Sequence, residues 1–279
     1  MEQGIITTLR YFLQFDYAPT FSELYMFHPT LVSEARLNQE LQNLHRKKKI
    51  LCTTEPDGEA RYTLGGYSTL LNKTSMRASI SRAKIKRLRT YLRILQKMNI
   101  ISLIGLSGSV AMGHADHEAD VDLFIITQAG RMWSARAAAL AAAAALGVRR
   151  GRLSTPKSAR NKVCLNMFMD ESDLKVPKQK QTSFVAHEIL QMKPVFTRGA
   201  IYHRFLQKNA WIFTFFPNAK TIIGPLNSTN NITSNTWSFI ETILKTVQLS
   251  LINRHKTTEI ITDTQLWFFP DDFEKKVRV

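Results

Sequence analysis

Two aspartates, one residue apart inside an apolar run, constrain this chain more than any other feature. They stand at the start of ADVDLFII, residues 119–126. Side chains alternate between the faces of a strand, so Asp120 and Asp122 project from one face while Val121 and Leu123 project from the other. Carboxylates about 6–7 Å apart on one face repel each other unless a cation lies between them. Mg²⁺ commonly binds through one or two carboxylates, so the pattern predicts a magnesium site.

A Gly-Ser pair precedes the aspartates and follows the apolar, β-prone run Ile100 to Leu106. Gly108 has no Cβ, which allows backbone N–H groups to approach a phosphate closely. Ser109, at the start of a short helix, can donate to the same phosphate oxygens. Arg131, which opens the helix after the aspartate strand, is a further candidate for contact with a triphosphate. The order strand, Gly-Ser turn, helix, aspartate strand therefore predicts a nucleoside triphosphate site.

The stretch GSVAMGHADHEADVDLFII is similar to the signature of the nucleotidyltransferase fold superfamily, which includes DNA polymerase beta, the CCA-adding enzymes and the antibiotic nucleotidyltransferases. Ten residues separate Ser109 from Asp120, as in that signature. The resemblance covers roughly Ile100 to Thr127. It implies that Gly108 and Ser109 contact the triphosphate, and that Asp120 and Asp122 are catalytic ligands of two Mg²⁺ ions.

The mechanism that the resemblance implies is transfer of NMP from an NTP to a hydroxyl, with release of pyrophosphate. It needs a third carboxylate on a neighbouring strand, which we expect in Asn161 to Met169. The corresponding position holds Asn166, whose amide binds Mg²⁺ poorly and cannot act as a base. Asp170, at the end of this strand, is the candidate substitute, and Glu171 and Asp173 are spaced more loosely.

Asn166 leaves several functions open. The first is an active nucleotidyltransferase. The second is a catalytically impaired regulator that binds nucleotide or nucleic acid, and the third is an antitoxin of the minimal-nucleotidyltransferase type.

The charge distribution indicates the class of acceptor. The net charge is +16, and residues 67–98 carry nine basic side chains and no acidic one. Leucine and isoleucine recur at helical spacing from Arg77 to Lys97, which predicts an amphipathic helix with a cationic face. A polyanionic acceptor such as RNA or DNA suits this charge, and a protein hydroxyl is the alternative. The residues expected to contact nucleic acid are Arg46, Lys47, Lys86, Arg89 and Arg93.

Residues 1–66 resemble a winged helix in the order of their elements, which is three helices followed by a hairpin around Pro56-Asp57-Gly58. The third helix starts near Ser33 and ends in the basic cluster Arg46 to Lys49. Winged helices often place this helix in the DNA major groove. Because the segment has a net charge of −1, a module that packs against protein is the alternative.

The predicted fold class is α+β: a winged helix joined to a nucleotidyltransferase domain, made of a mixed β-sheet with flanking helices, and to a C-terminal helical segment. The two cysteines, Cys52 and Cys164, have no zinc-site spacing, so we expect reduced thiols in a cytoplasmic protein without a membrane segment. His187 and Glu188 are interpreted as scaffold. The expected divisions are 1–66 (winged helix), 67–98 (basic connecting helix), 99–225 (nucleotidyltransferase domain) and 226–279 (linker and helical segment), with further helices at 131–146, 183–192, 205–216 and 237–254 and a polar linker at 227–235.

Overall fold

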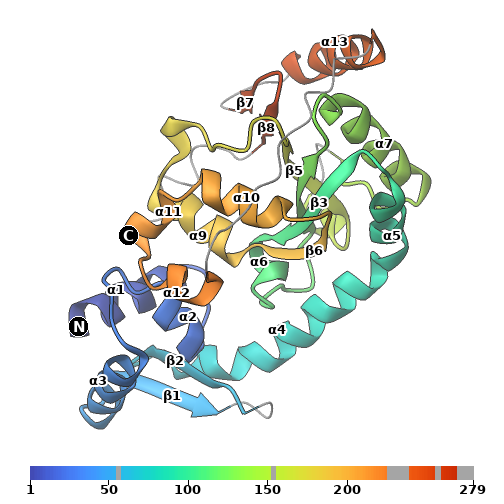
Figure 1. Ribbon diagram of the computed structural model, residues 1–279. Coiled ribbons are helices and arrows are strands. Elements are labelled where there is room, and N and C mark those ends of the chain that lie inside the picture. The colour runs from blue at the N-terminus through green and yellow to red at the C-terminus, as the bar shows by residue number, and fades with distance from the viewer. Residues whose placement is uncertain (55–57, 152–154, 225–238, 255–258, 269–279) are drawn as a thin grey trace.

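The computed structural model describes residues 1–54, 58–151, 155–224, 239–254 and 259–268, and these form a mixed α+β structure (Figure 1). The predicted turn residues Pro56 and Asp57 and the predicted linker at 227–235 lie outside the described residues. The N-terminal unit has the predicted order of elements: α1 (Glu2–Leu13), α2 (Phe21–Met26), α3 (Glu34–Arg46), β1 (Ile50–Thr54) and β2 (Ala60–Leu64).

Local side-chain chemistry explains where these helices begin. The Thr20 side chain accepts from the Glu23 backbone N–H, and the Glu23 carboxylate accepts from the Thr20 backbone N–H at 2.8 Å, which is a capping box. Ser33 caps α3 through its side chain alone, which accepts from the Arg36 backbone N–H. Leu37 and Leu41 then face the core of this unit, as their helical spacing predicted.

The basic connecting segment, expected as one helix at 67–98, is divided in two. It comprises α4 (Ser68–Arg87) and α5 (Arg89–Lys97), which meet at Leu88. Leu88 is buried, and its backbone N–H still bonds to carbonyls of the preceding turn. The apolar periodicity continues across this junction, so the pattern alone predicted a single helix from Arg77 to Lys97.

A six-stranded mixed sheet carries the Gly-Ser pair and the aspartates. Its strand order is β6-β3-β4-β5-β8-β7. The neighbours β3 and β4 are antiparallel, whereas β4 and β5 are parallel. The strands are β3 (Ile101–Ser107), β4 (Val121–Thr127), β5 (Val163–Asp170), β6 (Lys193–Thr197), β7 (Ile260–Ile261) and β8 (Gln265–Trp267).

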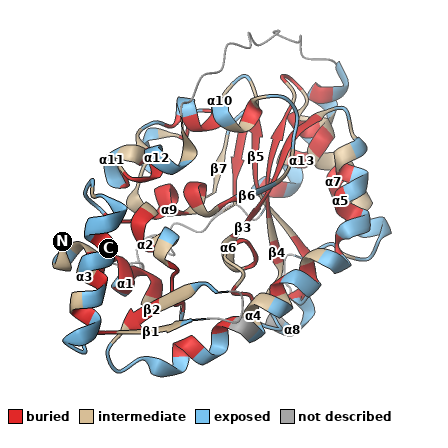
Figure 2. Cartoon of the chain, turned by 60° about the horizontal axis from the view of Figure 1, so that its bottom comes forward, coloured by how far each residue is buried: buried red, intermediate tan, exposed pale blue. Residues whose placement is uncertain are grey.

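Helices cover both faces of this sheet, and its central strands β3 and β4 are buried almost throughout (Figure 2). One face packs against α9 (Ser183–Gln191), α10 (Ile201–Lys208) and α11 (Ile212–Phe215), together with the N-terminal helices. The other packs against α5, α7 (Met132–Ala145) and α13 (Phe239–Asn253). Alternate residues of β4 therefore enter different cores: Phe124 belongs to the first, whereas Leu123 and Ile125 belong to the second.

Three features differ from the sequence prediction. The aromatic stretch 205–216 is divided between α10 and α11 near Asn209, whose side chain donates to the carbonyl oxygens of Phe205 and of Leu174, which follows β5. A strand, β6, follows α9 directly and begins at Lys193. The C-terminal segment was expected to be helical, but after α13 it returns to the sheet, where Trp267 of β8 pairs with Met167 of β5.

The N-terminal unit is packed onto the sheet domain through an aromatic cluster. The His187 ring on α9 is buried and stacks on Tyr11 with a centroid distance of 3.6 Å and on Phe27 at 4.3 Å. Burial lowers the pKa of His187 well below 6.5. The ring is therefore neutral at neutral pH and serves as packing, as the interpretation of His187 as scaffold requires.

In the described part of the chain, no helix combines the length and the apolarity that crossing a membrane requires.

Candidate functional site

The Gly-Ser pair lies directly against the aspartate strand. Strand β3 ends at Ser107, which is opposite Asp122 on β4, and the four-residue helix α6 (Gly108–Ala111) follows. Gly108 adopts a positive φ of 62°, and a Cβ built on it would lie 2.7 Å from Asp122 Oδ2. Glycine is therefore required twice, once by the backbone conformation and once by the carboxylate that occupies the space of a side chain.

The two aspartates converge, as the alternation of side chains predicted. Oxygen atoms of Asp120 and Asp122 and the Sγ of Cys164 lie within 4.8 Å of one another, so this cluster could hold a metal ion. Burial, with repulsion from Asp120 and then Glu188, raises the pKa of Asp122 to about 7. Arg150 and the hydrogen bond from Asn166 oppose part of this rise.

Strand β5 brings Cys164 and Asn166 to the aspartates. Cys164 is paired with Asp122, and the register of β4 and β5 shifts between Leu123 and Phe124. The Cys164 thiol donates to Asn166 Oδ1 at 2.6 Å, and the Asn166 amide donates to Asp122 Oδ1. Asn166 thus occupies the predicted third-acid position as a neutral hydrogen-bond donor to Asp122.

Arg150 provides a positive charge beside this cluster. Its Nη1 lies 2.5 Å from Asp120 Oδ2, and it also donates to Cys164 Sγ at 3.5 Å. The Arg150 backbone is fixed by its N–H, which donates to Val163 O at 3.1 Å. The ion pair is partly exposed, with 38% of the Arg150 side chain accessible to solvent.

A cavity of about 480 Å³ opens in front of the Gly-Ser turn. Its lining combines Gly108, Ser109 and Asp122 with Glu188 of α9 and with Gln14, Phe15 and Asp16 of the N-terminal unit. The N-terminal unit therefore forms one wall of the candidate site.

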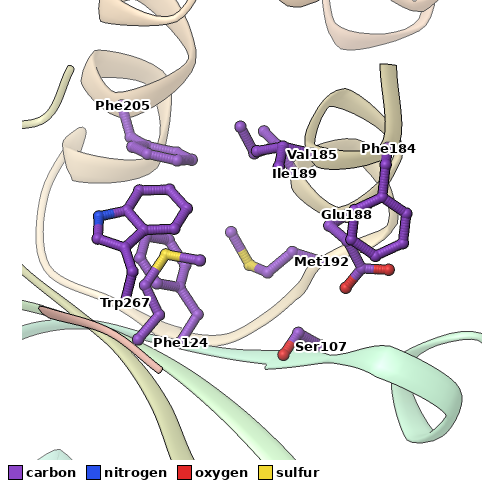
Figure 3. A pocket seen from close by; sticks show the side chains of 10 residues that line it. Ser107, Phe124, Phe184, Val185, Glu188, Ile189, Met192, Phe205 and Trp267 are labelled. Carbon is purple, nitrogen blue, oxygen red and sulfur yellow. The ribbon is translucent and has the colours of Figure 1, made fainter. Parts of the chain in front are cut away.

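Glu188 brings a further carboxylate to this cavity. Figure 3 shows its side chain pointing from α9 toward Ser107, beside the apolar side chains of Phe184 and Met192. Burial in these surroundings raises the pKa of Glu188 to about 7, and a hydrogen bond from the Gly108 backbone N–H opposes part of that rise. Glu188, which we had interpreted as scaffold, is thus in the lining of the candidate site.

The loop that leads into Asp120 is held by Lys84 of α4. The Lys84 ammonium is buried and donates to the carbonyl oxygens of His117 at 3.0 Å and Ala119 at 2.6 Å, and to Asn161 Oδ1 at 3.1 Å. The basic helix is therefore joined to the aspartate strand immediately before its first carboxylate.

Two of the weaker predicted site residues are not brought to the aspartates. Asp170 pairs with Thr127, at the opposite end of β4 from Asp122. Its carboxylate is buried and accepts from the Gly130 backbone N–H at 2.7 Å, so it orders the loop before α7. Arg131 belongs to the same loop and precedes Met132, the first residue of α7.

The other two candidate acids have partners elsewhere. Glu171 accepts from Ser102 Oγ at 3.2 Å, and Asp173 accepts from Thr264 Oγ1 at 2.7 Å. The residues predicted to contact nucleic acid are all exposed, namely Arg46, Lys47, Lys86, Arg89 and Arg93.

Sequence reasoning missed Glu188, Arg150 and Lys84 as contributors to the site. Glu188 had a detectable signal, because it is the acidic residue in the mainly apolar helix SFVAHEILQ. Arg150 and Lys84 belong to basic runs, in which no spacing distinguishes a residue that will reach a carboxylate or carbonyl from one that faces solvent.

Comparisons with protein-family models, with curated proteins and with solved structures gave no match. The candidate function therefore rests on the residues and on their geometry.

Proposed function

We propose that this protein is a Mg²⁺-dependent nucleotidyltransferase that moves NMP from an NTP to a hydroxyl of a nucleic-acid acceptor. The observation that carries the proposal is the fit between Gly108 and Asp122. The glycine leaves the space that the carboxylate fills, so the predicted phosphate-binding turn and the predicted metal-binding strand share one cavity wall.

The donor set fits a hard divalent cation. Asp120 and Asp122 offer carboxylate oxygens, which Mg²⁺ prefers, and the adjacent cavity is large enough to admit phosphates and water. When bound there, Mg²⁺ would neutralise triphosphate charge and lower the pKa of the acceptor hydroxyl. Cys164 adds a softer ligand, which favours ions such as Zn²⁺.

The chain's own residues would bind and orient the nucleotide. Ser109 lines the cavity, and the Gly108 N–H is positioned to donate to an oxygen, an interaction that Glu188 now receives. A triphosphate would compete with Glu188 for that N–H. Because Asn166 is neutral, we assign the role of the additional acid to Glu188, which is the acidic residue of this lining that accepts from the Gly108 N–H.

Incubation with radiolabelled NTP, Mg²⁺ and bulk RNA or DNA tests the proposal. We expect labelled nucleic acid from the wild-type protein and none from the double variant D120N/D122N, which keeps the side-chain shapes. The control is D263N, because Asp263 pairs with Lys245 on the surface and should leave labelling unchanged. E188Q should reduce labelling while NTP binding persists.

A regulator that binds nucleotide without transferring it is the second candidate, and the hydrogen bond from Asn166 to Asp122 favours it. The regulator hypothesis requires that the wild-type protein bind NTP but label no RNA, DNA or protein acceptor. The same incubation therefore separates the two functions.

A further inference from the structure

We propose that a second cavity binds a phosphate of the acceptor nucleic acid, and that this phosphate draws Arg150 away from Asp120 and so strengthens metal binding at the aspartate pair. The inference rests on the proposed function, because it assigns the acceptor to a place beside the same aspartates. It adds a site for that acceptor and a coupling between the acceptor and the metal.

The second cavity has a volume of about 520 Å³. Cys164 and Asn166 of β5 form part of its lining, and both also contact the aspartates or their immediate partners. Gln248 of α13 and Phe268 contribute further lining. The Gly-Ser turn lines the first cavity and not this one, so we assign the nucleotide to the first cavity and the acceptor phosphate to the second.

Three guanidinium groups gather in the second cavity, those of Arg136, Arg149 and Arg150, and Glu259 is an acidic member of its lining. Burial and then the charge of Arg149 lower the pKa of Arg136 to about 10, so these cations are close enough to repel. Arg136 Nε is buried, and the described residues offer it no hydrogen-bond partner.

An anion with several oxygens would satisfy these arginines. Arg136 already donates to Gln248 Oε1 at 2.6 Å and lies over the Phe268 ring at 5.1 Å, which holds its guanidinium in place. Guanidinium groups recognise phosphate through paired N–H donors, and clustered like charges are relieved by a bound anion. The cavity therefore suits a phosphate.

Arg150 connects this cavity to the metal cluster. Arg150 lines the cavity, yet its Nη1 bonds to Asp120 Oδ2. A metal ion at the aspartate pair would also bind through a carboxylate oxygen of Asp120. A guanidinium and a divalent cation beside one carboxylate repel each other and compete for its oxygens. The Arg150 backbone is bonded to Val163, so rotation of the side chain alone would exchange the carboxylate for a phosphate. By thermodynamic linkage, an anion that favours this rotation must increase the affinity for the metal, and the metal must increase the affinity for the anion by the same factor.

A nucleic acid fits better than an isolated phosphate ion because further cations line another hollow, whose Arg160 and Asn161 precede the β5 residues of the second cavity along the chain. Lys86, Arg87 and Arg160 line this hollow with His117 and Asn161, at the place where Lys84 holds the loop before Asp120. A chain of phosphates could engage these side chains together with the second cavity.

The test measures Mn²⁺ binding, by electron paramagnetic resonance of the unbound ion, without and with a short single-stranded oligoadenylate. Sodium sulfate at matched ionic strength is the second anion probe. The variants are R150A, which removes the competing guanidinium, and R149A, which weakens the cavity but keeps the pair with Asp120. The matched control is R10A, because Arg10 is exposed on α1 and its loss changes the net charge equally.

We expect oligoadenylate to tighten Mn²⁺ binding about fivefold in the wild-type protein and in R10A. A change of this size is what the loss of one partly exposed ion pair would produce. R150A should bind Mn²⁺ about fivefold more tightly without oligoadenylate and gain nothing from it, and R149A should gain less than wild type. D122N with oligoadenylate measures how much Mn²⁺ the oligonucleotide itself holds.

Equal Mn²⁺ affinity in R150A and R10A would overturn the inference, as would tightening by sulfate without tightening by oligoadenylate. The proposed function fails in a different way, namely if D122N binds Mn²⁺ as well as the wild-type protein does.

Discussion

Substitution of Gly108 by alanine tests whether the Gly-Ser turn and the aspartate strand form one site. The new methyl group would meet Asp122 Oδ2 at 2.7 Å, and Gly108 has φ 62°. Two separable effects follow. The left-handed backbone conformation costs about 1–2 kcal/mol for a residue with a Cβ. The overlap with the carboxylate must be relieved by movement of the Asp122 side chain, since the methyl group is fixed to the backbone.

A second glycine separates these two effects. Gly113 follows α6 with φ 68°, and a Cβ built on it meets no atom within 4 Å. G113A should therefore carry the conformational cost alone. We expect both variants to lose about 1–2 kcal/mol of unfolding free energy in urea titrations. G108A should in addition bind Mn²⁺ about tenfold more weakly, which corresponds to ~1.4 kcal/mol for a displaced ligand.

The measurements are urea denaturation for stability and Mn²⁺ titration for the site. If G108A and G113A bind Mn²⁺ equally well, Asp122 is not a metal ligand or has room to move without consequence, and the reasoning is refuted. If G108A loses no stability, the positive φ is not a constraint at this position.

Two further predictions concern pH and metal selectivity. H187F should keep the stacking on Tyr11 and Phe27 and should lose less stability in acid than the wild-type protein does. Above pH 6.5 the His187 ring is neutral in the folded and in the unfolded protein. Below pH 6.5 the ring takes up a proton in the unfolded chain but stays neutral in the folded protein, because burial lowers its pKa there. Between pH 7 and pH 5 the wild-type protein should therefore lose about 2 kcal/mol more than H187F in urea titrations, and equal losses would exclude a buried neutral ring. C164S should weaken Zn²⁺ binding about tenfold in competition titrations and leave Mg²⁺ binding unchanged, because thiolates favour the softer ion; a change in Mg²⁺ affinity would show that the thiol supports the carboxylates instead.

The strands that carry the site could be predicted because their signals are local. Alternation placed Asp120 and Asp122 on one side of β4, and the structure brings their carboxylates together with Cys164. The Gly-Ser turn likewise follows β3, as expected. Each of these features depends on a few consecutive residues, so the pattern contains the relevant information.

Other features depend on packing between distant segments and could not be read from a local pattern. Strands β7 and β8 have two and three residues, too few for a detectable alternation. The junction of α4 and α5 at Leu88 leaves the apolar spacing intact. Glu188 and Arg150 reach the aspartates from elements that follow them along the chain, and position in three dimensions alone reveals their proximity to the site.

The pairing of β8 with β5 also has a consequence for biosynthesis. The ribosome makes the aspartate strand and its neighbours β3 and β5 well before Trp267, the residue of β8 that pairs with Met167 of β5. Until then β5 presents unpaired backbone groups and apolar side chains, which is the kind of edge on which nascent chains associate with one another. We therefore expect a chain terminated after residue 258 to retain both aspartates in its sequence and yet to be recovered as aggregate.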